Sequence, residues 1–223
     1  HMRLAALTSG GKDSLYAVYL ARKGGHDIRY LLSMTPESHE SYMFHHPNIE
    51  LTEIQAELMG IPLLVEKTSG EKEEELKDLE RLILRVKDEV DGILTGVIAS
   101  NYQRERIDGI CEKFSLECIS PLWHINPEKY WHELMRSGFR IMITSVSAEG
   151  LDKGWLGRII DEKAIDELKE LNRRFKIHLS FEGGEAETLV LDCPMFRKGI
   201  KIVEAKREWD GQRGTYVIKR WVY

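Results

Sequence analysis

The feature that most constrains this chain is the run Ser9-Gly10-Gly11-Lys12-Asp13-Ser14. It follows a short apolar segment, Leu4 to Leu7, and opens a second one, Leu15 to Ala21, which closes with Arg22-Lys23-Gly24-Gly25 as helices commonly do. This order predicts a buried strand that turns through two glycines into a helix. Such a turn exposes several backbone N–H groups at the positive end of the helix dipole, which makes it an anion site.

The side chains of this run also suit phosphate. Ser9 and Ser14 add hydroxyl donors, and Asp13 suits a helix N-terminus or a magnesium ion held beside phosphates. Lys12 opposes the helix dipole in the first turn unless an anion lies there too. The alternative is an ordinary tight turn with a solvated lysine. The spacing is neither that of a Walker A loop nor Gly-x-Gly-x-x-Gly.

The first half of the chain alternates strands and helices, which predicts a parallel sheet. After the first strand and helix, we expect strands at 28–33, 62–66, 92–95 and 116–119, and helices at 48–59, 71–90 and 100–114. In open parallel sheets, ligands bind beyond the carboxyl ends of the strands, where the strand order reverses. Polar or glycine-rich residues lie at three of these ends, namely Thr8 to Ser14, Ser33 to Thr35, and Thr95-Gly96 continuing to Arg106.

These strand ends predict a nucleotide site. Ser33, Met34 and Thr35 could read an adenine edge through backbone groups, and Gly96 would let a nucleotide approach the main chain closely. Gln103 and Arg106 lie on one face of an early helical turn, near a positive helix end. A pyrophosphate or carboxylate partner would explain Arg106, and a surface arginine paired with Glu105 or Glu112 is the alternative.

The chain changes character after Pro121. We expect helices at 127–137 and 161–175, a strand at 140–146, and a terminal hairpin of 200–209 and 214–223 around Asp210-Gly211. The pattern predicts an α/β nucleotide-binding domain over residues 1–122 and a smaller α+β domain over 123–223. The segment Glu182-Gly183-Gly184-Glu185-Ala186-Glu187-Thr188 gathers three carboxylates between apolar stretches, which favours a functional role over a solvated acidic turn.

Composition excludes several classes of protein. A net charge of −5 and a pI near 6.0 argue against sequence-blind nucleic-acid binding, so we expect no stable nucleic-acid complex. No apolar run approaches the ~18 residues of a membrane span, and no signal peptide is evident. The three cysteines lack Cys-x-x-Cys spacing and an even count, which fits a reducing cytoplasm.

The glycine-rich run resembles the Ser-Gly-Gly-x-Asp-Ser pyrophosphate loop of the ATP pyrophosphatase family. Further stretches narrow the resemblance to the diphthine–ammonia ligase family, with this chain similar to a compact, archaeal-like member. The stretches that carry this resemblance are 9–14, 35–45, 96–106, Pro121-Leu122-Trp123, Gly154-Trp155-Leu156-Gly157-Arg158 and 182–188.

The resemblance implies a HUP or Rossmann-like fold and an ATP-dependent amidation of diphthine on elongation factor 2. ATP would adenylate the diphthine carboxylate and release pyrophosphate, and ammonia would then displace AMP to give diphthamide. The implied cofactors are ATP and Mg²⁺, with Asp13 as the metal ligand. The implied catalytic residues are Lys12, Arg106, Glu182, Glu185 and Glu187. The implied nucleotide-binding residues are Ser9, Gly10, Gly11, Lys12, Asp13, Ser14, Ser33, Met34, Thr35, Gly96, Ser100 and Gln103, and the implied substrate-binding residues are Trp155, Arg158, Gly183, Gly184 and Thr188.

Diphthine carries a quaternary ammonium, so its site should contain aromatic faces. Trp123, Trp131 and Trp155 are candidates, with Trp155 favoured because Gly154 and Gly157 flank it. The acidic segment could bind that cation, or hold ammonium and help remove its proton.

Two other functions stay open at this point. The first is a tRNA-modifying enzyme with the same loop, although thiolation normally calls for paired cysteines. The second is a non-catalytic ATP-binding sensor, which has no need of a carboxylate cluster. His39, His45 and His46 could suggest a metal site, but no fourth ligand accompanies them, so we expect them either to line or cap the nucleotide pocket or to lie in a mobile loop. The sequence leaves a homo-oligomer possible.

Overall fold

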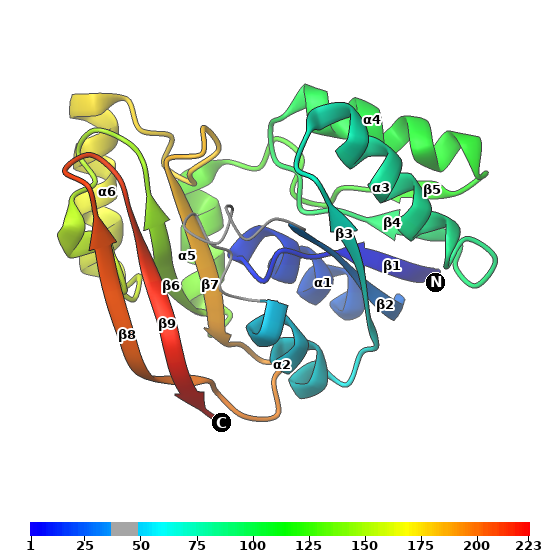
Figure 1. Ribbon diagram of the computed structural model, residues 1–223, viewed down its shortest axis with the longest axis horizontal. Coiled ribbons are helices and arrows are strands. Elements are labelled where there is room, and N and C mark those ends of the chain that lie inside the picture. Colours follow the sequence, from blue (N-terminus) through cyan, green and yellow to red (C-terminus); the bar gives the residue numbers. More distant parts are fainter. Residues whose placement is uncertain (37–48) are drawn as a thin grey trace. The chain divides into compact units, whose positions relative to one another are not determined.

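The computed structural model describes residues 1–36 and 49–223, so the expectation for His39, His45 and His46 lies outside the described residues. The chain divides into two compact units, His1–His124 and Ile125–Tyr223. The sequence places this boundary after residue 122, and the contacts place it after His124. The two units are coloured blue to green and green to red in Figure 1.

The first unit is a five-stranded parallel sheet of order β3-β2-β1-β4-β5. Its strands are β1 (Arg3–Leu7), β2 (Asp27–Pro36), β3 (Leu63–Thr68), β4 (Gly92–Leu94) and β5 (Glu117–Ile119). Its helices are α1 (Lys12–Lys23), α2 (Ile49–Met59), α3 (Lys72–Leu84) and α4 (Asn101–Lys113). Helices α1 and α2 lie on one face of the sheet and α3 and α4 on the other (Figure 1). The parallel α/β architecture expected from the sequence is confirmed.

The position of β1 at the centre of the sheet explains why its sequence is a continuous apolar run. Leu4, Ala5 and Ala6 are at most 1% exposed, because helices cover both faces of a parallel sheet. On the α3 and α4 face, the core gathers Ala5, Leu32, Leu79, Leu82, Ile83, Val86, Val90, Ile93, Ile107, Ile110 and Cys111.

The helix expected at 71–90 is shorter than the sequence predicts. Helix α3 ends at Leu84, and turns follow to residue 89. The N–H groups of Arg85, Val86 and Glu89 donate to carbonyls three residues back, which tightens the chain. Val86 and Val90 are nevertheless buried, so the apolar spacing identified core positions correctly but overestimated the length of the regular helix.

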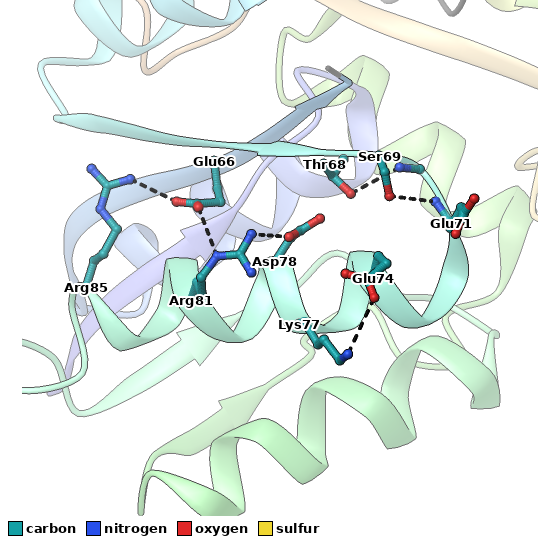
Figure 2. Close-up of polar contacts among 10 residues, drawn as sticks. Glu66, Thr68, Ser69, Glu71, Glu74, Lys77, Asp78, Arg81 and Arg85 are labelled. Carbon is teal, nitrogen blue, oxygen red and sulfur yellow. Dashed lines mark hydrogen bonds and ion pairs between the residues drawn. The ribbon is translucent and has the colours of Figure 1, made fainter. Parts of the chain in front are cut away.

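An ion-pair cluster ties the end of β3 to α3 (Figure 2). Arg81 lies between two carboxylates, with its Nε 3.3 Å from Glu66 Oε1 and its Nη2 bonded to Asp78. The Asp78 side chain is 7% exposed, and burial by itself would raise the pKa of its carboxyl group. A hydrogen bond from Thr68 and, next to it, the hydrogen bond and charge of Arg81 hold that pKa below its ordinary value. This cluster holds the carboxyl end of β3 against α3, and at the same end Thr68 pairs with Pro36 of β2.

The second unit is an antiparallel sheet of order β7-β6-β9-β8 with two helices (Figure 1). Its elements are α5 (Pro127–Arg136), β6 (Arg140–Val146), a 3-10 turn η2 (Lys153–Trp155), α6 (Glu162–Phe175), β7 (Ala186–Asp192), β8 (Lys201–Trp209) and β9 (Gly214–Val222). Strands β8 and β9 form the expected terminal hairpin. The expected α+β character of this half is confirmed.

Caps and core contacts explain the helices of the second unit. Asn126 Oδ1 accepts from Lys129 N at the start of α5, and Asp161 Oδ1 accepts from Ala164 N at the start of α6. Trp131 is fully buried on α5, and its indole N–H donates to the Leu179 carbonyl at 2.8 Å. Trp131 is therefore a core residue and offers no face to a ligand, contrary to its place among the aromatic candidates.

Among residues 1–36 and 49–223, no helix is both long enough and apolar enough to cross a membrane.

Candidate functional site

The candidate site in the first unit lies where the strand order of the sheet reverses. Strands β2 and β3 extend from one side of β1, and β4 and β5 from the other. The switch point is therefore between the carboxyl ends of β1 and β4, where open α/β sheets bind their ligands. The run Ser9–Ser14 follows β1, and Gly96 follows β4, so both lie at this point.

Hydroxyl groups hold the loop after β1 in shape. The N–H groups of Ser9, Gly10 and Gly11 donate to Ser14 Oγ, Thr8 Oγ1 and Ser9 Oγ at 3.2, 3.1 and 3.3 Å. Gly10 has a φ of +81°, a conformation that favours glycine. Three consecutive amides thus lie in one turn at the N-terminus of α1. Each N–H donates to a neutral hydroxyl oxygen, and an anion is a stronger acceptor that can replace this oxygen.

Lys12 is the unusual member of the loop. It is 2% exposed, which is rare for a lysine, and its Nζ lies 2.7 Å from Asp13 Oδ1. Asp13 is 33% exposed, so its carboxylate faces water while the ammonium is enclosed. A buried cation at the positive end of a helix needs anionic compensation. Asp13 supplies one charge here.

Position 96 has to be a glycine because the backbone of Asp13 and Ser14 packs directly against it. A Cβ at this position would lie 2.6 Å from the carbonyl carbon and oxygen of Asp13 and 2.7 Å from Ser14 N. The sequence suggests that Gly96 lets a nucleotide approach the main chain closely; the structure shows that the space a side chain would need at this position is occupied by the first turn of α1. Gly96 therefore sets the contact between the end of β4 and the loop after β1.

The other residues expected at the nucleotide site lie on β2 and at the start of α4. Ser33 is buried, and Met34 and Thr35 are half-buried next to it on β2. Ser100 caps α4, because its Oγ accepts from Gln103 N at 3.2 Å. Arg106 lies over the Tyr102 ring at 3.3 Å and donates to the Tyr102 carbonyl.

In the second unit, the Gly154–Arg158 segment packs on the hairpin. Trp155 is 7% exposed, and the Arg158 guanidinium lies 4.3 Å from its ring centroid. Arg158 also pairs with Glu167. A Cβ on Gly157, whose φ is +79°, would lie 2.5 Å from the Tyr216 ring. A quaternary ammonium reaches that face of Trp155 only by displacing Arg158.

The three glutamates of the acidic segment have different surroundings. Glu185 accepts from His178 N at 2.6 Å and from Gly183 N at 2.7 Å, so its carboxylate organises the loop itself. Ser147 donates to the Gly184 carbonyl, which ties the loop to the end of β6. Glu187 and Thr188 are already in β7, with Glu187 exposed and Thr188 half-buried. Glu182 is half-buried, and Gly183 and Gly184 are exposed.

Two residues outside Ser9–Ser14 also hold the loop after β1: Thr8, which the sequence already places at the polar end of the first strand, and Gln55, which no expectation from the sequence includes. Thr8 accepts from Gly10 N and lies 3.2 Å from Ser14 Oγ. Gln55, on α2, is 1% exposed and donates from Nε2 to the Gly10 carbonyl at 3.1 Å. The available signal was the helical spacing of Gln55 from Leu51 and Leu58, which places its polar side chain on the buried face of the helix.

Fold and loop together define a protein with a parallel α/β unit, in which a loop with three successive backbone amides joins the first strand to the first helix. Family models of the diphthamide synthase N-terminal and C-terminal domains match residues 2–118 and 126–223. This chain belongs to the diphthamide synthase family, and the resemblance drawn from its motifs is confirmed.

Curated relatives carry the name diphthine–ammonia ligase. The human protein is 35% identical, over 89% of this chain and 82% of its own length. The Schizosaccharomyces pombe protein is 34% identical over 91% of this chain, but this chain spans only 36% of that protein. A crystal structure described as a predicted subunit of tRNA methyltransferase from Methanocaldococcus jannaschii aligns with 87% of this chain and 98% of that chain, at 17% identity and a TM-score of 0.46. That likeness is not evidence for a shared function.

Proposed function

We propose that this protein is an AMP-forming amide ligase that converts diphthine on elongation factor 2 to diphthamide. The diphthine carboxylate attacks the α-phosphorus of ATP, which forms an acyl-adenylate and releases pyrophosphate. Ammonia then attacks the acyl carbon, so that AMP leaves, the amide forms and one proton is lost. The names of the relatives support this reaction.

The observation that carries the proposal is the enclosed Lys12 at the N-terminus of α1. A buried ammonium beside three loop amides suits the β- and γ-phosphates, where negative charge grows as pyrophosphate leaves. Asp13, its partner at 2.7 Å, is exposed enough to take a metal ion in place of Lys12. We expect the ammonium to turn to phosphate when that exchange occurs.

Mg²⁺ fits the same arrangement. Among residues 1–36 and 49–223 no group of three or more His, Cys, Asp or Glu side chains is arranged to hold a metal. Mg²⁺ commonly binds through one or two carboxylates plus substrate phosphates, so Asp13 with ATP is a sufficient ligand set. When bound, the ion would neutralise phosphate charge.

Arg106, Glu182 and Glu187 complete the proposed machinery, with Ser33 to Thr35 at the adenine edge. Arg106 rests on Tyr102, a contact that a phosphate or carboxylate would compete for. Glu182 and Glu187 are the acidic-segment carboxylates we propose to hold ammonium. Glu185 and the glycines shape that loop, and Trp155 with Arg158 and Thr188 would contact the diphthine side chain.

The test is a mass-spectrometric assay with diphthine-bearing elongation factor 2, ATP, Mg²⁺ and ammonium. We expect the amide on the modified histidine together with AMP and pyrophosphate. Lys12→Met should abolish all three products, and Lys23→Met, at the exposed end of the same helix, should retain them. ADP in place of AMP, or pyrophosphate release stimulated by tRNA with no amide, would refute the proposal.

A further inference from the structure

The phosphate loop is held from behind by a residue on a different helix. Gln55 lies on α2, which is joined to the loop only through α1, β2 and the chain that follows β2. Its Nε2 donates to the Gly10 carbonyl at 3.1 Å, and the whole residue is 1% exposed. The contact joins residues 45 positions apart in a fully buried environment.

Shape as well as hydrogen bonding makes this contact specific. A Cβ on residue 10 would lie 2.8 Å from Gln55 Oε1 and 3.4 Å from Thr52 Oγ1. The side-chain amide of Gln55 therefore occupies the space that any other residue at position 10 would need. Glycine is required at position 10 for two reasons: the side chain of Gln55 leaves no room for a Cβ, and the φ of +81° favours glycine.

The direction of the Gly10 carbonyl decides where the next amide points. In a trans peptide unit the C=O and the N–H that follows it point in opposite directions. Gln55 holds the Gly10 carbonyl toward α2, so the Gly11 N–H points away from α2. There it meets Ser9 Oγ at 3.3 Å, within the turn that opens α1.

We infer that Gln55 is a positioning residue for phosphate: it fixes the Gly10–Gly11 peptide so that the Gly11 N–H is presented to the anion at the α1 N-terminus. This inference rests on the proposed function, because it assigns phosphate to that turn. Without Gln55 the carbonyl loses its buried donor, and the peptide can rotate its oxygen toward the anion. A carbonyl oxygen there would repel phosphate.

The test compares Gln55→Met, which keeps the length of the side chain but removes the donor, with Arg22→Met. Arg22 Nη2 donates to the Met59 carbonyl at 3.4 Å, so the control loosens the other end of the same two helices without touching the loop. Calorimetry would measure binding of inorganic pyrophosphate and of adenosine to each protein. NMR of the ligand-free proteins would follow the Gly11 amide.

We expect Gln55→Met to weaken pyrophosphate binding about three- to tenfold, the effect of one neutral hydrogen bond, while adenosine binding stays within about twofold. The Gly11 amide resonance should shift in Gln55→Met and not in Arg22→Met. An equal loss for pyrophosphate and adenosine would reduce Gln55 to a packing role and overturn the inference. So would unchanged pyrophosphate binding.

Failure of the proposed function has a separate signature. A wild-type protein that binds pyrophosphate but forms no amide would refute the ligase assignment and leave the role of Gln55 intact. A wild-type protein that binds no pyrophosphate would overturn both.

Discussion

Replacing Gly96 by alanine should damage the phosphate loop from outside it. The new methyl carbon would lie 2.6 Å from the Asp13 carbonyl, whereas ordinary contact begins at 3.4 Å, so the two backbones must separate by about 0.8 Å. The β4 side cannot yield easily. Thr95 N donates to the Ile119 carbonyl at 2.9 Å, and Thr95 Oγ1 lies 2.9 Å from Ser120 Oγ. The displacement therefore falls on the first turn of α1.

This displacement has a cost in stability and a cost in turnover. Overpacking a rigid site costs about 1–3 kcal/mol, which corresponds to a melting temperature lower by about 2–12 °C for a chain of this length. A shift of about 1 Å in a reacting group can lower a rate by about 10²-fold. Pyrophosphate release should therefore fall by about that factor.

The matched control is Gly109→Ala in the same unit. Gly109 is exposed within α4, and a Cβ added there would have nothing within 4 Å, so alanine should stabilise the helix by about 0.5–1 kcal/mol. Thermal unfolding and pyrophosphate release would be measured on both variants. Equal melting temperatures for the two, or wild-type release by Gly96→Ala, would refute the packing argument.

Three other perturbations test the remaining contacts. Gly157→Ala should lose about 2–4 kcal/mol in thermal unfolding, because it combines a positive φ with the Tyr216 clash, whereas Gly184→Ala, with a similar φ and open surroundings, should lose only about 1 kcal/mol. The hydrogen bond from Arg3 lowers the pKa of Asp91 from 3.8 to about 2, so its stabilising contribution is complete above about pH 4 and is lost as the pH falls toward 2. Asp91→Asn should flatten the pH dependence of urea unfolding in that window, and Asp88→Asn, 87% exposed, should not. Glu185→Ala should speed hydrogen exchange at the His178 and Gly183 amides, whereas Glu187→Ala, at an exposed position on β7, should leave both protected; equal protection in the two variants would contradict a loop-organising role.

The fold was predictable because its signals are local. The alternation of apolar strands and amphipathic helices indicated the parallel sheet, and the Asp210-Gly211 turn indicated the hairpin. The error at α3 has a physical cause. Successive turns with hydrogen bonds three residues back can bury Val86 and Val90 as well as a regular helix can. The apolar periodicity therefore predicted the buried positions but not the backbone conformation between them.

The candidate site was predictable only where its parts are contiguous. An anion-binding loop needs successive amides from one turn, so the contiguous run Ser9 to Ser14 is enough to predict it from the sequence. Gln55, in contrast, acts on Gly10 across 45 residues, and only the packing of α2 brings them together. The roles of Glu185 and Arg158 depend in the same way on His178 and on Trp155.

Glycine shows most clearly where reasoning from the sequence stops. A glycine beside a ligand loop is compatible with close approach by a ligand or by the protein's own backbone, and the sequence is the same in both cases. At Gly96 the neighbour is the backbone of Asp13, and at Gly157 it is the ring of Tyr216. Both glycines therefore matter before any substrate binds. Substitutions there should lower the stability of the ligand-free protein, whereas a glycine kept only for a ligand would lower affinity alone.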